Sequence, residues 1–98
     1  MCLGGAMARS KQRVWGFDKA ERQVLMEATA ELAALHAVVT RAELRADLDG
    51  LWLVKATVAE LDEMYSLVEA LMAATRSRKR LELLEGLRAT LCTSIDGF

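Results

Sequence analysis

The sequence predicts an all-α protein: a small antiparallel bundle of three long helices and one short helix that assembles into an oligomer. Residues 18–39, 57–73 and 81–95 carry apolar side chains at spacings of three and four, the period of an amphipathic helix. The chain has no proline, and 53% of its residues are hydrophobic, many of them leucine or alanine, which favour helices. We therefore expect a helical domain over residues 18–98 after a flexible basic arm over residues 1–17.

The first long helix is expected to begin at Asp18. This aspartate suits the N-cap position, and both Asp18 and Glu21 suit the positive end of a helix. The apolar positions that follow alternate steps of three and four: Leu25, Ala28, Leu32, Leu35, Val39 and Ala42. Such a seam is suited to a bundle interface. Trp15 and Phe17 lie just ahead of this helix, and we expect their large rings to dock on the bundle.

A break is expected near Thr40. Thr40 and Glu43 have the spacing of a capping box, in which a threonine and an acid three residues later satisfy the first N–H groups of a helix. The pattern predicts a short helix that ends at Asp49 and Gly50, a pair typical of chain reversals.

Residues 51–54, Leu-Trp-Leu-Val, are apolar on every side. Periodicity alone leaves three interpretations open: a short buried strand, an extended link or the end of a helix. Because Thr57 and Glu60 match a second capping box, a new helix is expected to start there. We favour a short linker over residues 51–56.

The last two helices are expected to be separated by a basic turn. The apolar face that starts after Thr57 cannot continue through residues 75–80, Thr-Arg-Ser-Arg-Lys-Arg, and a new face begins at Leu81. This shift predicts a turn between antiparallel helices. No glycine or proline enforces the turn, so one continuous helix with a shifted face remains the alternative. Gly97 is expected to end the last helix.

Charge is nearly balanced, with a net charge of -1, so no overall field directs the protein to nucleic acid or a membrane. The two ends of the chain are basic and the middle is acidic. The sharpest local feature is the basic turn, which contains Arg76, Arg78, Lys79 and Arg80. It could bind phosphates or an acidic partner together with Lys11 and Arg13 of the arm. A solvated turn or a protein contact is the favoured interpretation.

Residue patterns for catalysis or metal binding are missing from the sequence. His36 is the only histidine, and no carboxylate lies within one helical turn of it. Cys2 and Cys92 have no companions at metal-ligand spacing, which favours a reduced, cytoplasmic protein. No apolar run approaches the roughly 20 residues of a membrane span, and no signal peptide is evident; either Met1 or Met7 could be the start. We expect no enzymatic activity, cofactor or metal.

The apolar content exceeds what one stripe on each helix can bury, so the surplus is expected at a subunit interface. The residues in surplus are Leu25, Met26, Trp52, Leu53, Leu67 and Leu83. The leading hypothesis is a protein–protein interaction module that forms homodimers or larger homo-oligomers and has no catalytic activity. The alternative is a small nucleic-acid-associated or regulatory protein that uses the basic turn and the arm.

Overall fold

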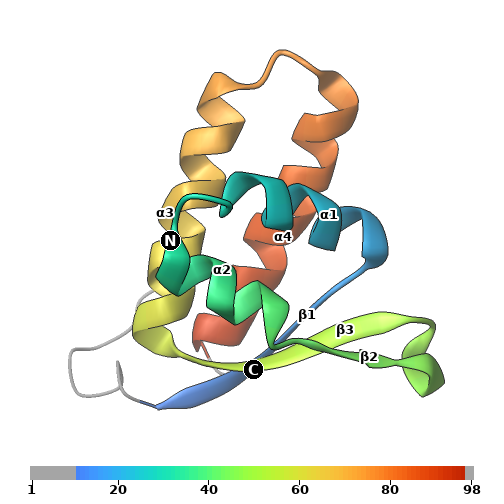
Figure 1. Cartoon of the computed structure of the whole chain (residues 1–98). Coiled ribbons are helices and arrows are strands. Elements are labelled where there is room, and N and C mark those ends of the chain that lie inside the picture. Colours follow the sequence, from blue (N-terminus) through green and yellow to red (C-terminus); the bar gives the residue numbers. More distant parts are fainter. Residues whose placement is uncertain (1–10, 97–98) are drawn as a thin grey trace.

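The computed structural model describes residues 11–96 and shows a mixed α/β fold, in which helices pack on an antiparallel sheet (Figure 1). The prediction of an all-α helical bundle is therefore wrong. In chain order the elements are β1 (Gln12–Phe17), α1 (Lys19–Ala28), α2 (Ala33–Thr40), β2 (Glu43–Arg45), the short 3-10 helix η2 (Ala46–Leu48), β3 (Leu51–Thr57), α3 (Val58–Ala74) and α4 (Arg78–Asp96).

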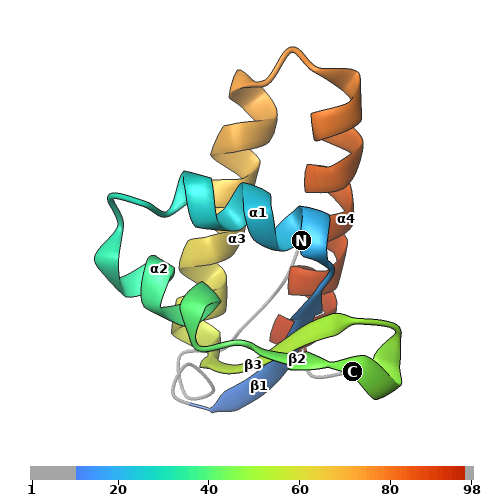
Figure 2. The ribbon, with the colours of Figure 1, turned by 45° about the vertical axis from the view of Figure 1, so that its right-hand side comes forward.

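The sheet has the strand order β1-β3-β2, and both pairings are antiparallel. β3 is central: Gln12 to Phe17 of β1 pair with Thr57 to Trp52, and Glu43 to Arg45 of β2 pair with Leu53 to Leu51. The helices lie together on one side of the strands in both ribbon views (Figures 1 and 2). The sheet therefore has an inner face toward the helices and an outer face that no helix of residues 11–96 covers.

The inner face supplies the largest core side chains. Trp15 and Phe17 of β1 are fully buried, with their ring centroids 4.8 Å apart in an edge-to-face arrangement. The indole Nε1 of Trp15 donates a hydrogen bond to Thr90 Oγ1 at 3.0 Å, which links β1 to α4. The expected docking of these rings is confirmed, but Gln12–Phe17 docks as a strand and not as part of a flexible arm. Residues 1–10 of the predicted arm lie outside the described residues.

The first predicted helix is divided in two. Its start is confirmed, because Asp18 and Glu21 form a capping box. Its heptad seam is interrupted at Thr29, which is fully buried in the turn after α1. The Thr29 hydroxyl donates to Leu25 O at 2.7 Å and lies 3.1 Å from His36 Nδ1 of α2. These contacts stabilise the turn, so the seam does not continue as one helix.

The predicted short helix after Thr40 is wrong. Thr40 is the last residue of α2, and its hydroxyl donates to Ala37 O instead of capping a new helix. Glu43 begins β2. Asp49 and Gly50 adopt positive φ angles of 56° and 78°, so this pair reverses the chain between β2 and β3.

Residues 51–54 belong to β3, and the linker favoured from the sequence is wrong. Of the three interpretations that the sequence left open, the strand is correct. The capping box at the end of β3 is confirmed: Glu60 N donates to Thr57 Oγ1 at 3.1 Å, and Thr57 N donates to Glu60 Oε1 at 2.9 Å.

The α3–α4 hairpin follows the sequence prediction closely. α3 and α4 are separate helices joined by residues 75–77, so the turn is confirmed but is shorter than predicted, and Arg78, Lys79 and Arg80 belong to α4. Ser77 Oγ accepts a hydrogen bond from Arg80 N at 3.3 Å, so a side chain satisfies one of the first N–H groups of α4. Among the described residues, no helix is long and apolar enough to span a membrane.

Candidate functional site

The outer face of the sheet is the most distinctive surface of the described chain. Side chains alternate between the two faces of a strand, so the residues between the buried ones on β1 and β3 point outward. Val14 is 55% exposed and Leu51 36% exposed, although both are apolar. Leu53 is half-buried on the same face, opposite Gly16 in the β1–β3 register. The face therefore carries an apolar strip in the open.

Gly16 leaves room for this strip. A Cβ atom added at Gly16 would lie 2.8 Å from Leu53 Cδ2, closer than real Cβ contacts. The Leu53 side chain thus lies over the backbone of β1 in the space that a side chain at position 16 would occupy. The glycine has a packing role here, since it lets Leu53 fold down onto the neighbouring strand.

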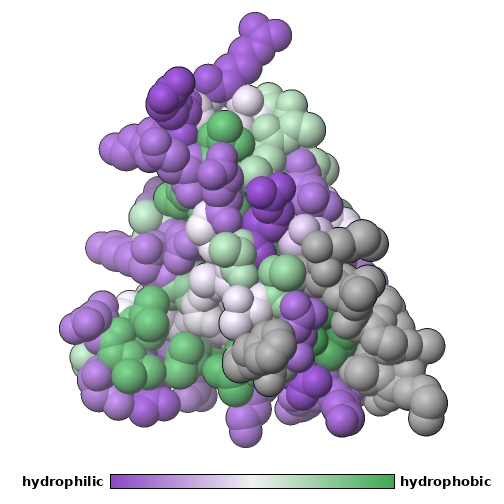
Figure 3. All heavy atoms as spheres, turned by 180° about the vertical axis from the view of Figure 1, so that it is seen from behind, coloured by the Kyte–Doolittle hydropathy of each residue, from purple (hydrophilic) through white to green (hydrophobic). Residues whose placement is uncertain are grey.

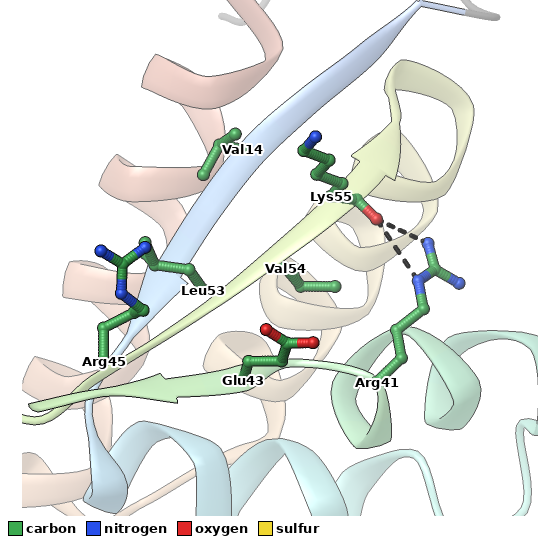
Figure 4. A pocket seen from close by; sticks show the side chains of 7 residues that line it. All are labelled: Val14, Arg41, Glu43, Arg45, Leu53, Val54 and Lys55. Atoms are coloured by element: carbon green, nitrogen blue, oxygen red, sulfur yellow. Dashed lines mark hydrogen bonds between the residues drawn. The ribbon is translucent and has the colours of Figure 1, made fainter.

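A shallow hollow of about 470 Å³ lies on the outer face, and Figure 4 views it with the helices behind the strands. Its lining residues are Val14, Arg41, Glu43, Arg45, Leu53, Val54 and Lys55. Apolar side chains mix with charges of both signs. This composition is typical of a protein contact, in which an apolar centre is surrounded by a polar rim.

Arg41 holds the wall of this hollow in place. Its guanidinium donates to Lys55 O from Nε at 3.3 Å and from Nη2 at 2.9 Å, and it pairs with Glu60 at 3.0 Å. The hydrogen bond from Arg41 lowers the pKa of the Glu60 carboxyl below its ordinary value, against a smaller opposing effect of burial. Arg41 therefore connects the end of α2 to β3 and α3, and its role is structural.

The β2–β3 hairpin extends the apolar surface to one end of the molecule. Leu44 on β2 is 54% exposed, and Leu48 in η2 is 41% exposed. Seen from behind, hydrophobic residues gather at the end of the molecule where the hairpin lies (Figure 3). We call Val14, Leu44, Leu48 and Leu51 the sheet-end patch. Val14 and Leu51 lie on the outer face, whereas Leu44 is opposite Trp52 in the register and so lies on the other face of the sheet.

The two charged residues of β2, Glu43 and Arg45, flank Leu44 in sequence and lie on the opposite face of the strand. Arg45 pairs with Asp47 through two hydrogen bonds of 3.1 and 2.9 Å. These bonds lower the pKa of the Asp47 carboxyl and raise that of the Arg45 guanidinium. Glu43 forms no ion pair with any residue between 11 and 96.

The basic turn lies far from the basic residues of the predicted arm. Arg76 follows α3, and Arg78, Lys79 and Arg80 form the first turn of α4. Lys11 lies at the opposite end of α3, because Lys11 O accepts a hydrogen bond from Val58 N at 3.0 Å. Seventeen helical residues separate the two ends, which is about 25 Å at 1.5 Å per residue. Arg13, on β1, pairs with Ala56 near the start of α3, so the structure does not bring the two basic groups together.

The predicted interface residues are divided between the interior and the surface. Leu25 is fully buried in the core and offers no surface to a partner. Met26, Leu67 and Leu83 are partly buried against the core. Trp52 and Leu53 do lie at the sheet end, where the Arg22 guanidinium stacks 4.1 Å from the Trp52 ring centroid.

Sequence reasoning missed the four residues of the sheet-end patch as a group. The signal was the period-two alternation around Val14 and Gly16 and around Leu51 and Leu53. This alternation does not stand out in the sequence, because each run is short and has apolar residues on both faces of the strand.

Within residues 11–96, no group of three or more potential metal ligands is present. No protein family model matches the chain, and no curated protein or solved structure matches it either. The function must therefore be argued from the surface itself.

Proposed function

We propose that this protein is a protein–protein interaction module that forms homodimers through the sheet end, with no catalytic role. The observation that supports the proposal is the sheet-end patch, where four apolar side chains between 36% and 55% exposed occur on adjacent strands and the intervening hairpin. Grouped apolar side chains on a small soluble domain are typical of protein contact sites.

The surroundings of the patch favour a protein partner over nucleic acid. The outer face presents Glu43 beside Arg45 and Lys55, so phosphates would meet charges of both signs. The helix pair α1 and α2 offers no basic recognition helix, because the exposed positions of α2 are Ala33, Ala34, Ala37 and Thr40.

Sedimentation velocity over a micromolar concentration range tests the proposal, with two matched leucines. Leu48 and Leu32 are 41% and 43% exposed, but only Leu48 belongs to the sheet-end patch; Leu32 lies in the turn before α2. We expect a wild-type dimer, a several-fold weaker dimer for Leu48→Ser, and an unchanged dimer for Leu32→Ser. A wild-type monomer throughout, or equal weakening by both variants, would contradict the proposal.

The nucleic-acid alternative stays a prediction for the basic turn alone. Arg76, Arg78, Lys79 and Arg80 form no ion pairs among the described residues. Binding to a nucleic-acid duplex at low and moderate salt tests this alternative, when the wild type is compared with a variant in which Arg78, Lys79 and Arg80 are changed to alanine. The cytoplasmic location expected from the sequence is likewise a proposal, which fractionation of cells would test.

A further inference from the structure

We propose that two copies of this chain pair through β2, antiparallel and about a two-fold axis at Leu44, so that their sheets join into one of six strands. This inference rests on the proposed homodimer and specifies its geometry. It starts from the two edges of the sheet, which differ in how they are protected.

The β1 edge is occupied by α4. Ser94 Oγ donates a hydrogen bond to Val14 O at 2.9 Å, and Trp15 is hydrogen-bonded to Thr90 of the same helix. An added strand would have to displace the hydrogen bond of Ser94 to the Val14 carbonyl. β1 is therefore a poor site for pairing with a second sheet.

The β2 edge is open within the described chain. β2 lies at the end of the strand order, and no described side chain hydrogen-bonds to its backbone. All three residues of Glu43–Arg45 are exposed. Alternate N–H and C=O groups of an edge strand point away from the sheet, where they can pair with another strand.

The sequence of β2 is complementary to itself in the antiparallel direction. When two copies align with Leu44 opposite Leu44, Glu43 of each copy faces Arg45 of the other. Residues directly opposite in an antiparallel pair have Cβ atoms about 5 Å apart, within reach of an ion pair. The alignment thus forms two ion pairs and one contact between leucines by a single two-fold operation, as a symmetric dimer requires.

Arg45 can take part without losing its bond to Asp47. Its Nε and Nη2 atoms hold the Asp47 carboxylate, which leaves Nη1 to donate to a second carboxylate. Glu43 has no ion pair among the described residues to break. Both side chains lie on the outer face, in register with Leu53 and Leu51. On that face the two new ion pairs would lie between the apolar strips of the two copies, and the Leu44 contact would lie on the opposite face, beside Trp52.

Charge reversal separates this geometry from any other dimer. Glu43→Arg and Arg45→Glu each place like charges opposite each other twice, so each should weaken the homodimer at least about tenfold. The double variant Glu43→Arg/Arg45→Glu restores both pairs in reverse and should recover the dimer. An equimolar mixture of the two single variants should form a heterodimer, because every facing pair is then opposite in charge.

The matched control is Glu69→Arg, which reverses an exposed charge on α3 that pairs with Arg88 of α4. It should leave the dimer unchanged. Sedimentation velocity gives the dissociation constants, native mass spectrometry identifies the heterodimer, and circular dichroism checks that each variant is folded.

The outcomes distinguish this inference from the proposal on which it rests. Recovery by the double variant together with a heterodimer in the mixture supports pairing through β2. A wild-type dimer that is insensitive to all these reversals, or that neither recovers nor forms a heterodimer, overturns the inference but leaves the homodimer in place. A wild-type chain that stays monomeric overturns both.

Discussion

The α3–α4 hairpin and the three-stranded sheet bury their apolar side chains to different extents. The hairpin turns its apolar rows inward: Val58, Leu61, Met64 and Val68 on α3, and Leu84, Leu87, Leu91 and Ile95 on α4 are all buried. The sheet buries Trp15 and Phe17 but leaves Val14 and Leu51 in the open on its other face. The hairpin is complete within one chain, whereas the sheet has a face and an edge that a second chain could cover.

The two faces of β1 provide the largest expected contrast. Trp15→Ala removes a fully buried ring and its hydrogen bond to Thr90, and should lower the free energy of unfolding by about 3–5 kcal/mol or prevent folding. Val14→Ala, on the outer face of the same strand, should lower it by less than about 0.5 kcal/mol in the monomer. Urea unfolding at protein concentrations below the dissociation constant of the dimer measures both free energies. Similar losses at the two positions would mean that the outer face is not open.

Two threonines that have the sequence pattern of a capping box, Thr57 and Thr40, give a smaller contrast in stability. Thr57→Ala removes a real N-cap and should lower the free energy of unfolding by about 1 kcal/mol. Thr40→Ala alters the same residue type in a matching sequence pattern, but Thr40 ends α2 and should change that value by only a few tenths of a kcal/mol. Thermal or urea unfolding compares them. An equal loss at Thr40 would show that a helix does begin there.

The smallest effects concern two glutamates in equivalent capping positions, Glu21 and Glu60. The pKa of Glu60 is lowered, chiefly by Arg41, so the ionised form stabilises the fold above the unfolded pKa of about 4.3. That contribution is lost as pH falls through the lower folded pKa. We expect the stability difference between wild type and Arg41→Gln to include a pH-dependent part of a few tenths of a kcal/mol, present at pH 7 and absent in acid.

Glu21 should behave in the opposite sense. Burial raises its pKa, and the hydrogen bond from Asp18 N–H opposes that shift without cancelling it. A carboxyl with a raised folded pKa costs stability when ionised, and the cost disappears as pH falls through that pKa. Glu21→Gln keeps the capping box and should be as stable as wild type or slightly more so at pH 7, with no advantage in acid. Urea unfolding at several pH values tests both glutamates, and a parallel pH response would contradict this assignment.

Local sequence signals were sufficient for the helix starts at Asp18 and Thr57 and for the turn before α4. Each depends on side chains a few residues apart, so a short window contains the determining contacts. The same window misled at Thr40. There Arg41 reaches Lys55 and Glu60, and the tertiary contacts place Glu43 in a strand.

The sheet could not be predicted in this way, because its pairings are remote in sequence. Gln12 pairs with Thr57, and the two strands acquire their inner and outer faces only when paired. The candidate site shares this property. Trp52 and Leu53 were expected at an interface from their surplus apolar character, but Val14, Leu44 and Leu48 became neighbours of that surface only through the fold.

Backbone hydrogen exchange at low and high protein concentration tests the central claim most directly. Pairing of two chains through β2 predicts slower exchange at Glu43–Arg45 as the protein concentration rises through the dissociation constant, with no change at residues 75–77 in the α3–α4 turn. Exchange at β2 that stays the same while the protein dimerises would contradict pairing through this strand.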